Sequence, residues 1–506
     1  MKKSPKQHSV GRLSHKLKNR NDNRWLYSVV LTYMLSRVIL YFSGIEFNSG
    51  ENMPLINLLS VELLKNDLIN SIVYLHSQPP LFNVLIGIVH KIFGGYSIFF
   101  FKIFYLGMGL LISLSIFLLM KKLGVRDFIS GILTILFFIS PSSILFENIL
   151  FYTYPVVAML CFSAFFLHLY ISEQRALYGL IFFLIISCII LTRSLYHVIW
   201  FIAVLSLVLY HNKAMRRQIV IISLFPLFLI MLWYGKNLIL FDSFSSSFWL
   251  GMSMSKMTTM QLDNNVKLNE IQNGLLSELS LLPPFKGLWE YRDKVYLPND
   301  YTTGIQALDE EQYITGGNNL NNILYIGLSK TYMKDALHVI KIRPGVYAKS
   351  ILNSFKLFFY PASDWFSASS SNRSIIYNYE TMYNLIVLMQ VSAISNANMP
   401  REYNNVEYSL HGFNMAYLIV IKFITALVFG LYLLTKLHGN KQIRNDYTST
   451  VLYLFITIVY VSFFSSILDI GENQRFRYNI EPFLVILFGL SINYAVSYYI
   501  NFKAKK

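Results

Sequence analysis

The sequence predicts an all-α polytopic membrane protein, a bundle of about ten transmembrane helices with interfacial helices and an outer region. Hydrophobic residues make up 54% of the 506-residue chain and charged residues only 14%, a balance that excludes an ordinary soluble domain. Apolar runs of spanning length, about 20 residues each, recur from one end of the chain to the other. The net charge of +16 is explained by basic cytoplasmic loops and does not indicate nucleic-acid binding.

The first 24 residues form a basic leader that is expected to stay in the cytoplasm. The apolar segment from Trp25 to Gly44 follows without a small-residue cleavage site, so we expect a signal anchor that runs outward. Arg37 lies within this segment. A guanidinium at that depth is costly unless it is paired or reaches water, so Arg37 is either a functional residue or a side chain that snorkels to the outer headgroups.

Residues 45–97 are predicted to form the first outer loop, which ends in the motif His76-Ser-Gln-Pro-Pro-Leu81 and an apolar run from Leu81 to Phe93. This run is too short to cross a bilayer. Its polar and small residues recur on one helical face, which is typical of an amphipathic helix in the headgroup plane. Those residues are Asn83, Gly87, His90, Lys91 and Gly94.

A short transmembrane helix at Leu81 to Phe93 is the alternative, and the next span argues against it. The segment from Ile98 to Met120 is followed by a basic cluster, Lys121, Lys122 and Arg126. If the preceding run also crossed the membrane, this cluster would face outward, against the positive-inside bias.

The later spans alternate in direction, with predicted bounds 128–145, 153–171, 177–192, 197–210, 219–234, 413–435, 447–470 and 481–500. Residues 236–411 contain no clean span, and two short semi-apolar pieces there, 347–360 and 383–391, are predicted to be interfacial. The chain is thus expected to comprise four parts, with both termini in the cytoplasm. They are a leader (1–24), an N-terminal transmembrane module (25–234), an extracytoplasmic and interfacial region that is α-rich or mixed (235–412), and C-terminal transmembrane helices (413–506).

The polar residues that stand out gather on the predicted outer side. They are Glu46, Glu51, His76, Gln78, Glu147, Arg193, His197, Arg475 and Arg477, with Arg37 pointing toward the same level. The inner loops carry mostly Lys and Arg, without a Gly-rich phosphate loop or an Asp-x-Asp pattern, and the two cysteines, Cys161 and Cys188, lack metal-ligand spacing. Chemistry is therefore expected outside, where an energised donor would most simply be linked to a lipid.

Three of these features together resemble the GT-C glycosyltransferases, and most closely the bacterial protein-mannosyltransferase-like and aminoarabinose-transferase-like enzymes. They are the His76-Ser-Gln-Pro-Pro-Leu81 motif behind an acidic first loop, the short outer turn with Glu147, and the turn Glu472-Asn-Gln-Arg-Phe-Arg-Tyr-Asn-Ile-Glu-Pro482. The resemblance implies a GT-C-like bundle, a polyprenyl-phosphate sugar donor and inversion at the anomeric carbon. It also implies that an acidic residue just past the first span acts on the acceptor hydroxyl. That residue is Glu46 or Glu51, and Asn48 stands between them where the family more often has an aspartate.

The same roles follow from the chemistry of the transfer. An acceptor hydroxyl needs a positioned base, which contributes about 10²–10⁴-fold in rate. A phosphate leaving group needs cations, and Arg193, Arg475 or Arg477 could supply them. The two guanidinia of Arg475-Phe-Arg477 share a side only if that turn is extended.

The other candidate residues have two interpretations each. Glu147 would orient the acceptor or, with Glu46, help to hold a divalent cation, Mg²⁺ or Mn²⁺. It is also expected to begin a helix, where the helix dipole alone favours a carboxylate. Glu46 and Glu51 are otherwise ordinary solvated carboxylates, and His76, Arg193 and His197 interfacial anchors.

The sequence therefore predicts transfer of a sugar to a glycan, lipid or protein of the cell envelope, on the outer face of a bacterial-type inner membrane. A transporter or flippase of lipid-linked glycans is the main alternative. Arg37 and Lys422, which lie within spans, fit that class weakly, and the lack of an internal repeat opposes it. A glycan polymerase is a third interpretation.

Overall fold

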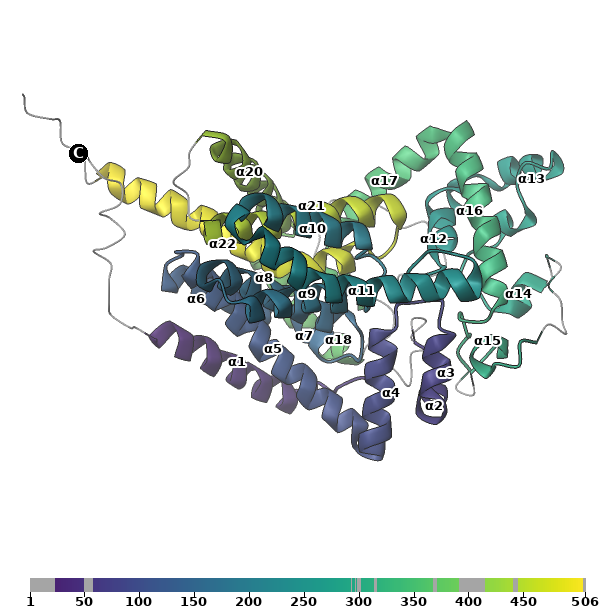
Figure 1. Ribbon diagram of the computed structural model, residues 1–506, viewed down its shortest axis with the longest axis horizontal. Coiled ribbons are helices and arrows are strands. Elements are labelled where there is room, and N and C mark those ends of the chain that lie inside the picture. The colour runs from purple at the N-terminus through teal and green to yellow at the C-terminus, as the bar shows by residue number, and fades with distance from the viewer. Residues whose placement is uncertain are drawn as a thin grey trace, which may run out of the picture.

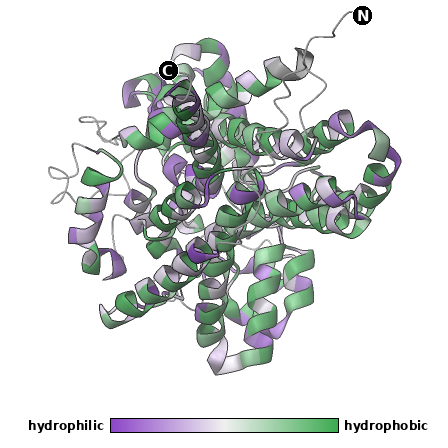
Figure 2. Ribbon diagram, turned by 90° about the vertical axis from the view of Figure 1, so that its left-hand side faces the viewer, coloured by the Kyte–Doolittle hydropathy of each residue, from purple (hydrophilic) through white to green (hydrophobic). Residues whose placement is uncertain are grey.

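The structure is a computed structural model that describes residues 23–49, 58–292, 294–295, 297, 302–313, 316–366, 371–390, 415–439 and 445–503. Over these residues the chain is built from helices, and β-type pairing is limited to two isolated bridges. Hydrophobic residues, green in Figure 2, cover most of the helical turns. The predicted all-α class is confirmed.

Seven stretches of the described chain are long and apolar enough to cross a membrane. They are α1 (Arg24–Phe42), the run of α4 (Leu81–Phe93), η2 (Gly94–Tyr96) and α5 (Ser97–Lys122), α8 (Thr153–Glu173), η3 (Lys213–Met215) with α11 (Arg216–Phe241), α20 (Tyr417–Gly439), α21 (Asn445–Leu468) and α22 (Asn473–Lys503). The pair α6 (Asp127–Phe138) and α7 (Pro141–Glu147) makes an eighth if its 59° bend is counted within one span. The chain is therefore a helical protein of the multi-pass membrane type. The expected ten spans would also need the shorter helices α9 (Ala176–Ile190) and α10 (Val198–His211).

The bundle is organised around α8, which packs against α5, α9, α21 and α22. The start of α1 and the end of α22 lie at the same end of the molecule in Figure 1. The predicted outer region lies at the opposite end. This region contains α12 (Leu250–Met257), η4 (Thr259–Gln261), α13 (Asn264–Gln272), η5 (Glu278–Leu281), α14 (Leu288–Arg292), α15 (Gln306–Asp309), α16 (Leu324–Ile342) and α17 (Pro344–Phe358).

Two of the predicted boundaries are wrong. The segment 128–145 is interrupted, because Ser140 caps a new helix by accepting a hydrogen bond from the Ser143 amide and Pro141 occupies its first turn. Glu147 is consequently the last residue of α7 and does not begin a helix. The turn expected over 471–479 is also largely helical, since α22 already begins at Asn473, whose side-chain amide bonds to Ser354.

The helix after the Pro-Pro motif turns sharply away from α5 in Figure 1. The break lies at Gly94, which adopts a positive φ of 52°. The stretch Leu81–Lys122 has 42 residues, about twice what one crossing needs, so α5 alone provides a span and α4 is left over. The run after the Pro-Pro motif is therefore a separate short helix of 13 residues, as predicted.

Only the first half of the polar face of α4 is buried, since Asn83 and Gly87 are covered while Lys91 and Gly94 are exposed. It packs against α2 (Val61–Asn66) and α3 (Leu68–Val73). Asn83 Oδ1 accepts a hydrogen bond of 3.0 Å from the Leu59 amide, and Gly87 lies against Leu64 and Leu68, where a Cβ would collide. Asn83 and Gly87 therefore serve close helix packing, while Ile88 and Ile92 remain exposed.

Candidate functional site

Two arginines from distant parts of the chain meet near the start of α22. Arg475 lies in the first turn of α22, and Arg193 lies in the connection between α9 and α10. Both face Tyr152, which precedes α8: Arg475 Nη1 donates to the Tyr152 hydroxyl at 3.2 Å, and the Arg193 guanidinium lies 5.3 Å from the Tyr152 ring centroid. The two cations are therefore joined through one aromatic side chain.

Arg193 is the less satisfied of the two arginines. It is 2% exposed, and neither Nη1 nor Nη2 has a hydrogen-bond partner among the described residues. Its guanidinium lies 4.5 Å from the Phe476 ring centroid, which stabilises the charge but leaves the planar fork of donors unused. Burial and the neighbouring Arg475 lower its pKa to about 10, so the group stays charged at neutral pH. A buried, charged fork without acceptors suits a bidentate anion.

Acidic residues balance part of this charge. Glu472 forms an ion pair with Arg475, and Asp469 lies 2.6 Å from Lys256 of α12. Burial would raise the pKa of Glu472, but Arg475, Lys256 and Arg193 outweigh it and hold that pKa below its usual range. The cluster therefore contains three cationic side chains and two carboxylates. The cations are Arg193, Arg475 and Lys256, and the carboxylates are Asp469 and Glu472.

The Pro-Pro motif lies beside this cluster. The Leu81 amide donates to the Leu191 carbonyl at 2.8 Å, which ties the start of α4 to the connection that carries Arg193. Phe82 contacts the Tyr152 ring edge-on, with centroids 5.9 Å apart. The start of α4 therefore lies beside Tyr152 and the connection that carries Arg193.

The carboxylate of Glu46 is exposed, and its main chain is held at the edge of this region. Its amide donates to Asn372 Oδ1 and its carbonyl accepts from Asn372 Nδ2, at 3.0 and 2.7 Å. Asn372 lies in α18 (Ser371–Ile375), which follows η6 (Ala362–Phe366). Trp365 of η6 lies 4.9 Å from the Arg475 guanidinium, so these short helices connect the Glu46 segment to the arginines. Glu51 lies outside the described residues.

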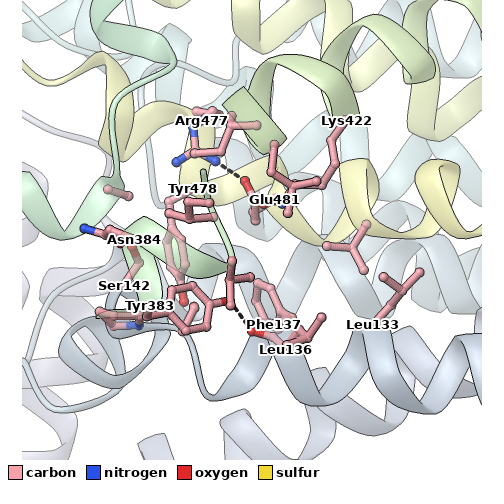
Figure 3. Close-up of a pocket in the computed structure, with 18 of the residues that line it drawn as sticks. Leu133, Leu136, Phe137, Ser142, Tyr383, Asn384, Lys422, Arg477, Tyr478 and Glu481 are labelled. Atoms are coloured by element: carbon pink, nitrogen blue, oxygen red, sulfur yellow. Dashed lines mark hydrogen bonds and ion pairs between the residues drawn. The ribbon is translucent and has the colours of Figure 1, made fainter. Parts of the chain in front are cut away.

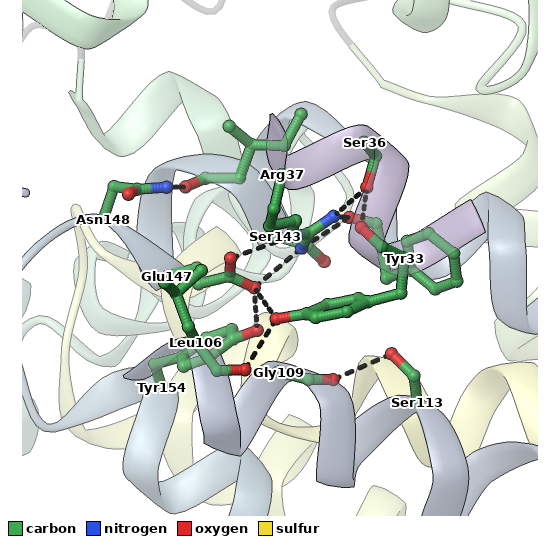
Figure 4. Close-up of polar contacts among 12 residues, drawn as sticks. Tyr33, Ser36, Arg37, Leu106, Gly109, Ser113, Ser143, Glu147, Asn148 and Tyr154 are labelled. Atoms are coloured by element: carbon green, nitrogen blue, oxygen red, sulfur yellow. Dashed lines mark hydrogen bonds and ion pairs between the residues drawn. The ribbon is translucent and has the colours of Figure 1, made fainter. Parts of the chain in front are cut away.

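Glu147 and Arg37 form a separate, closed cluster (Figure 4). Arg37 donates from Nε and Nη2 to the two carboxylate oxygens of Glu147 at 2.8 and 2.7 Å. The Tyr154 hydroxyl donates to Glu147 Oε2 at 2.8 Å, and the Tyr33 hydroxyl lies 3.1 Å from the same oxygen. Gly109 of α5 lies so close that a Cβ there would collide with Glu147 Oε2 and with the hydroxyls of Tyr33 and Tyr154. Both oxygens of Glu147 are therefore occupied and buried, which leaves it no position to orient an acceptor.

Arg477 does not join Arg475. Because α22 is already helical there, residues two apart point about 200° from each other. Arg477 instead forms an ion pair with Glu481 and donates to the Tyr360 carbonyl at 3.3 Å. The two guanidinia would share a side only in an extended turn, and the described residues from Asn473 onward are helical instead.

His76 and Gln78 are buried in a tightly held loop. Asn321 Oδ1 accepts from the amides of His76 and Ser77, and Lys236 Nζ donates to the Leu75 carbonyl. The His76 ring packs edge-on against Phe241 and Phe248, and neither ring nitrogen has a hydrogen-bond partner among the described residues. Burial, assisted by the charge of Lys236, lowers the pKa of His76 to about 3. The histidine shapes the loop and does not face the arginines.

His197 caps the start of α10, where its amide donates to the Tyr460 hydroxyl at 3.2 Å and its ring packs against Tyr234. It is an anchor of the helix end, one of its two expected interpretations.

Glu46 and Glu147, the proposed cation ligands, lie on neighbouring segments, because Asn48 pairs with Ile149. Within the described part of the chain, no group of three or more His, Cys, Asp and Glu residues could hold a metal ion. Glu147 is already neutralised by Arg37, while the carboxylate of Glu46 is exposed.

Tyr152, Trp365, Lys256 and Asp469 were not predicted as site residues. Tyr152 and Trp365 are ordinary members of an aromatic-rich sequence, and only the fold shows that their rings line the arginines. Asp469 could have been suspected as an acidic residue next to the end of the predicted span 447–470. Lys256 lies in a segment without a recognisable motif.

Comparison of the chain with protein-family models, with curated proteins and with solved structures finds no match.

Proposed function

We propose that this protein is a membrane glycosyltransferase that moves a sugar from a polyprenyl-phosphate donor to an acceptor of the cell envelope. The reaction takes place on the extracytoplasmic face of a bacterial-type inner membrane, with both termini of the chain in the cytoplasm. The acceptor is a hydroxyl of a glycan, a lipid or a protein, and the sugar configuration is inverted.

The observation that carries this proposal is the buried, unpartnered fork of Arg193 beside Arg475, next to the first turn of α4. Charge develops on the phosphate oxygens as the glycosidic bond breaks. Fixed guanidinia in a site shielded from water stabilise that charge strongly, because they need no reorganisation during the reaction. The interfacial setting of α4 would let the phosphate reach them while its prenyl chain stays in the membrane.

A carboxylate of the first outer segment, Glu46 or Glu51, serves as the base. It takes the proton of the acceptor hydroxyl, and the oxygen attacks the anomeric carbon from the face opposite the phosphate. The bond between that carbon and the phosphate oxygen breaks, and its electron pair leaves with polyprenyl phosphate. The leaving group is already a good one and needs no general acid.

The test uses membranes that carry the full chain and a panel of polyprenyl-phosphate sugars, with release of polyprenyl phosphate as the readout. We expect Arg193→Gln to lower the transfer rate at least about 100-fold, since removal of one preorganised donor in such sites costs about 10²–10³. Arg343→Gln is the matched control, because Arg343 is a half-exposed outer arginine paired only loosely with Glu270. Equal rates for Arg193→Gln and Arg343→Gln would remove the arginine pair from the mechanism.

The same membranes assign the base. Glu46→Gln and Glu51→Gln are compared with the native chain, and the one that abolishes transfer while the protein still inserts marks the base. Full transfer in both would exclude the first outer segment.

One observation favours the second candidate function, movement of a lipid-linked glycan. Lys422 and Glu481 form an ion pair inside α20 and α22, and buried charges within spans are frequent on transport pathways. Glycan that crosses the membrane in the same assay without a new glycosidic bond would favour this function over transfer.

A further inference from the structure

A second cationic site lies on the other side of α22, away from Arg193. It is a pocket of about 60 Å³ between α6, α19 (Tyr377–Ile386), α20 and α22 (Figure 3). Its polar lining includes Lys422, Arg477, Glu481 and Asn384, and the rest is largely apolar. Arg193 and Arg475 are not among the residues that line it.

The charges in this pocket do not balance. Lys422 and Arg477 both form ion pairs with the single carboxylate of Glu481. All three side chains are buried, with Lys422 7% exposed and Arg477 2% exposed. Two cations share one anion in a setting where an uncompensated charge is expensive, so one more negative charge would be stabilising.

Two further polar atoms around the pocket lack partners. Arg477 Nε and Asn384 Oδ1 are buried and form no hydrogen bond among the described residues. An unmade hydrogen bond of a buried polar group costs about 1–3 kcal/mol, so such atoms normally meet a ligand or an ordered water. Both residues line the pocket that Lys422 enters.

The size of the pocket suits a phosphate group. One water needs about 10–15 Å³ of such space, so the volume of about 60 Å³ holds about four to six waters, enough for the four oxygens of a phosphate. A small anion such as chloride would leave most of it empty.

The position of the pocket suits a lipid. Lys422 is the sixth residue of α20, which places it about 8 Å from the helix start at 1.5 Å per residue. The neighbouring helix surfaces expose large apolar side chains, among them Met382, Ile386, Ile421 and Ile424. A phosphate in the pocket could thus keep its hydrocarbon chains against α19 and α20.

We propose that the pocket formed by Lys422, Arg477, Glu481 and Asn384 binds the phosphate of a membrane lipid, at a site separate from the arginine pair. The lipid is either a bilayer phospholipid with a net negative headgroup or a polyprenyl phosphate, which share the same recognised group. Lys422 supplies the uncompensated charge, and Glu481 holds the two cations together when the pocket is empty. This binding requires no transfer reaction.

The test measures lipid retention by the purified full-length protein, using native mass spectrometry with phosphatidylglycerol, polyprenyl phosphate or phosphatidylcholine. Lys422→Met leaves the neutral pair of Arg477 and Glu481, and we expect at least a tenfold loss of affinity for the negatively charged lipids. Glu481→Gln leaves two cations, and we expect binding at least as tight as in the native protein. Phosphatidylcholine, whose headgroup is neutral overall, should respond little to either change.

Lys102→Met is the matched control. Lys102 is the sixth residue of α5, as Lys422 is of α20, but it lies over the Tyr41 ring, outside the pocket. Equal affinities for Lys102→Met and Lys422→Met would overturn the proposal, as would a loss of binding in Glu481→Gln. If Lys422→Met does not fold, Glu481→Gln decides alone.

The two negatively charged lipids separate the two sources. Dependence on Lys422 for polyprenyl phosphate alone would identify the pocket as a site for donor or product lipid. If Lys422→Met weakens the binding of phosphatidylglycerol alone, the pocket is a site for bilayer lipid. If it weakens the binding of both lipids, the pocket recognises the phosphate irrespective of the attached chain. Arg193→Gln should leave all three affinities for this pocket unchanged even if it abolishes transfer.

Discussion

At the scale of single residues, the Arg37–Glu147 pair shows how a charged residue in an apolar helix is accommodated. Its ion pair is 2.7 Å long, with the two side chains 8% and 1% exposed. The pair joins α1 to α7. The hydroxyls of Tyr33 and Tyr154 lie within hydrogen-bond distance of the Glu147 carboxylate. Such a pair contributes to stability mainly because either partner alone would be left buried and charged.

We therefore expect Arg37→Met to destabilise the protein by about 3–5 kcal/mol, as removal of one partner from a buried pair does elsewhere. The double variant Arg37→Met/Glu147→Gln should recover much of this loss, since the two tyrosine hydroxyls can bond to the neutral amide. Thermal unfolding of the detergent-purified proteins measures both. Additive losses would show that the two side chains act independently.

His76 gives the clearest dependence on pH. Its pKa is lowered to about 3 in the fold, against about 6.5 in an unfolded chain. Below pH 6.5 the unfolded chain binds a proton that the folded protein does not take up until about pH 3. Stability is therefore full above pH 6.5 and is lost as the pH falls toward 3.

At pH 5 this loss amounts to about 2 kcal/mol, from about 1.4 kcal/mol for each pH unit. His76→Phe keeps the aromatic packing against Phe241 and Phe248 and removes the titrating group. We expect its unfolding temperature to fall less than that of the native protein between pH 7.5 and pH 5. Equal falls would mean that His76 is hydrated or paired when the protein is folded.

At the scale of elements, the outer region holds the Pro-Pro loop through one side chain. Asn321 accepts from the amides of His76 and Ser77 and donates to the carbonyls of Tyr74 and Ala307. These contacts fix the loop that leads into α4, and α4 in turn supports Tyr152 and the arginines. The sequence offered no sign of this link, because residue 321 stands within a polar stretch more than 240 positions away.

Asn321→Ala should therefore loosen the loop as well as lower stability, since two buried amides would lose their acceptor at about 1–3 kcal/mol each. Faster hydrogen exchange at residues 74–78 is the expected readout. Asn321→Asp keeps the acceptor and should protect these two amides better. Unchanged exchange in Asn321→Ala would show that Lys236 and Ser247 hold the loop without it.

Sequence patterns located most of the helices but not the helix ends that are set by contacts between distant segments. Hydrophobic runs located most helices of the bundle, because length and apolarity are local properties of the chain. The continuation of α22 back to Asn473 depends on bonds from that residue to Ser354 and to the carbonyls of Ser465 and Asp469. Contacts between distant segments determined that Arg475 and Arg477 diverge, and no local pattern contains them.

At the scale of the whole molecule, the sequence predicted the class and the short helix after the Pro-Pro motif. It named Arg193, Arg475 and Arg477 as candidate phosphate ligands, and the structure brings the first two of them to the same aromatic ring. Its error was to treat all conspicuous charges as one site. The structure divides them into a closed pair at Arg37 and Glu147, an arginine pair with an unused fork, and a charged pocket at Lys422. Charge alone could not separate these, since pairing depends on which helices become neighbours.

The orientation of the molecule gives the last prediction. The helix α11 has 26 residues, about 39 Å at 1.5 Å per residue, and connects η3 to the outer region. Lys213, Arg216 and Arg217 surround its first turn and should lie in the cytoplasm. In a Cys161→Ala/Cys188→Ala background, Asn273→Cys should react with a membrane-impermeant maleimide on intact cells. Ala214→Cys should react only after permeabilisation, because α11 carries the chain across the membrane between them. The reverse pattern would place the arginine pair on the cytoplasmic side, where an extracytoplasmic acceptor could not reach it.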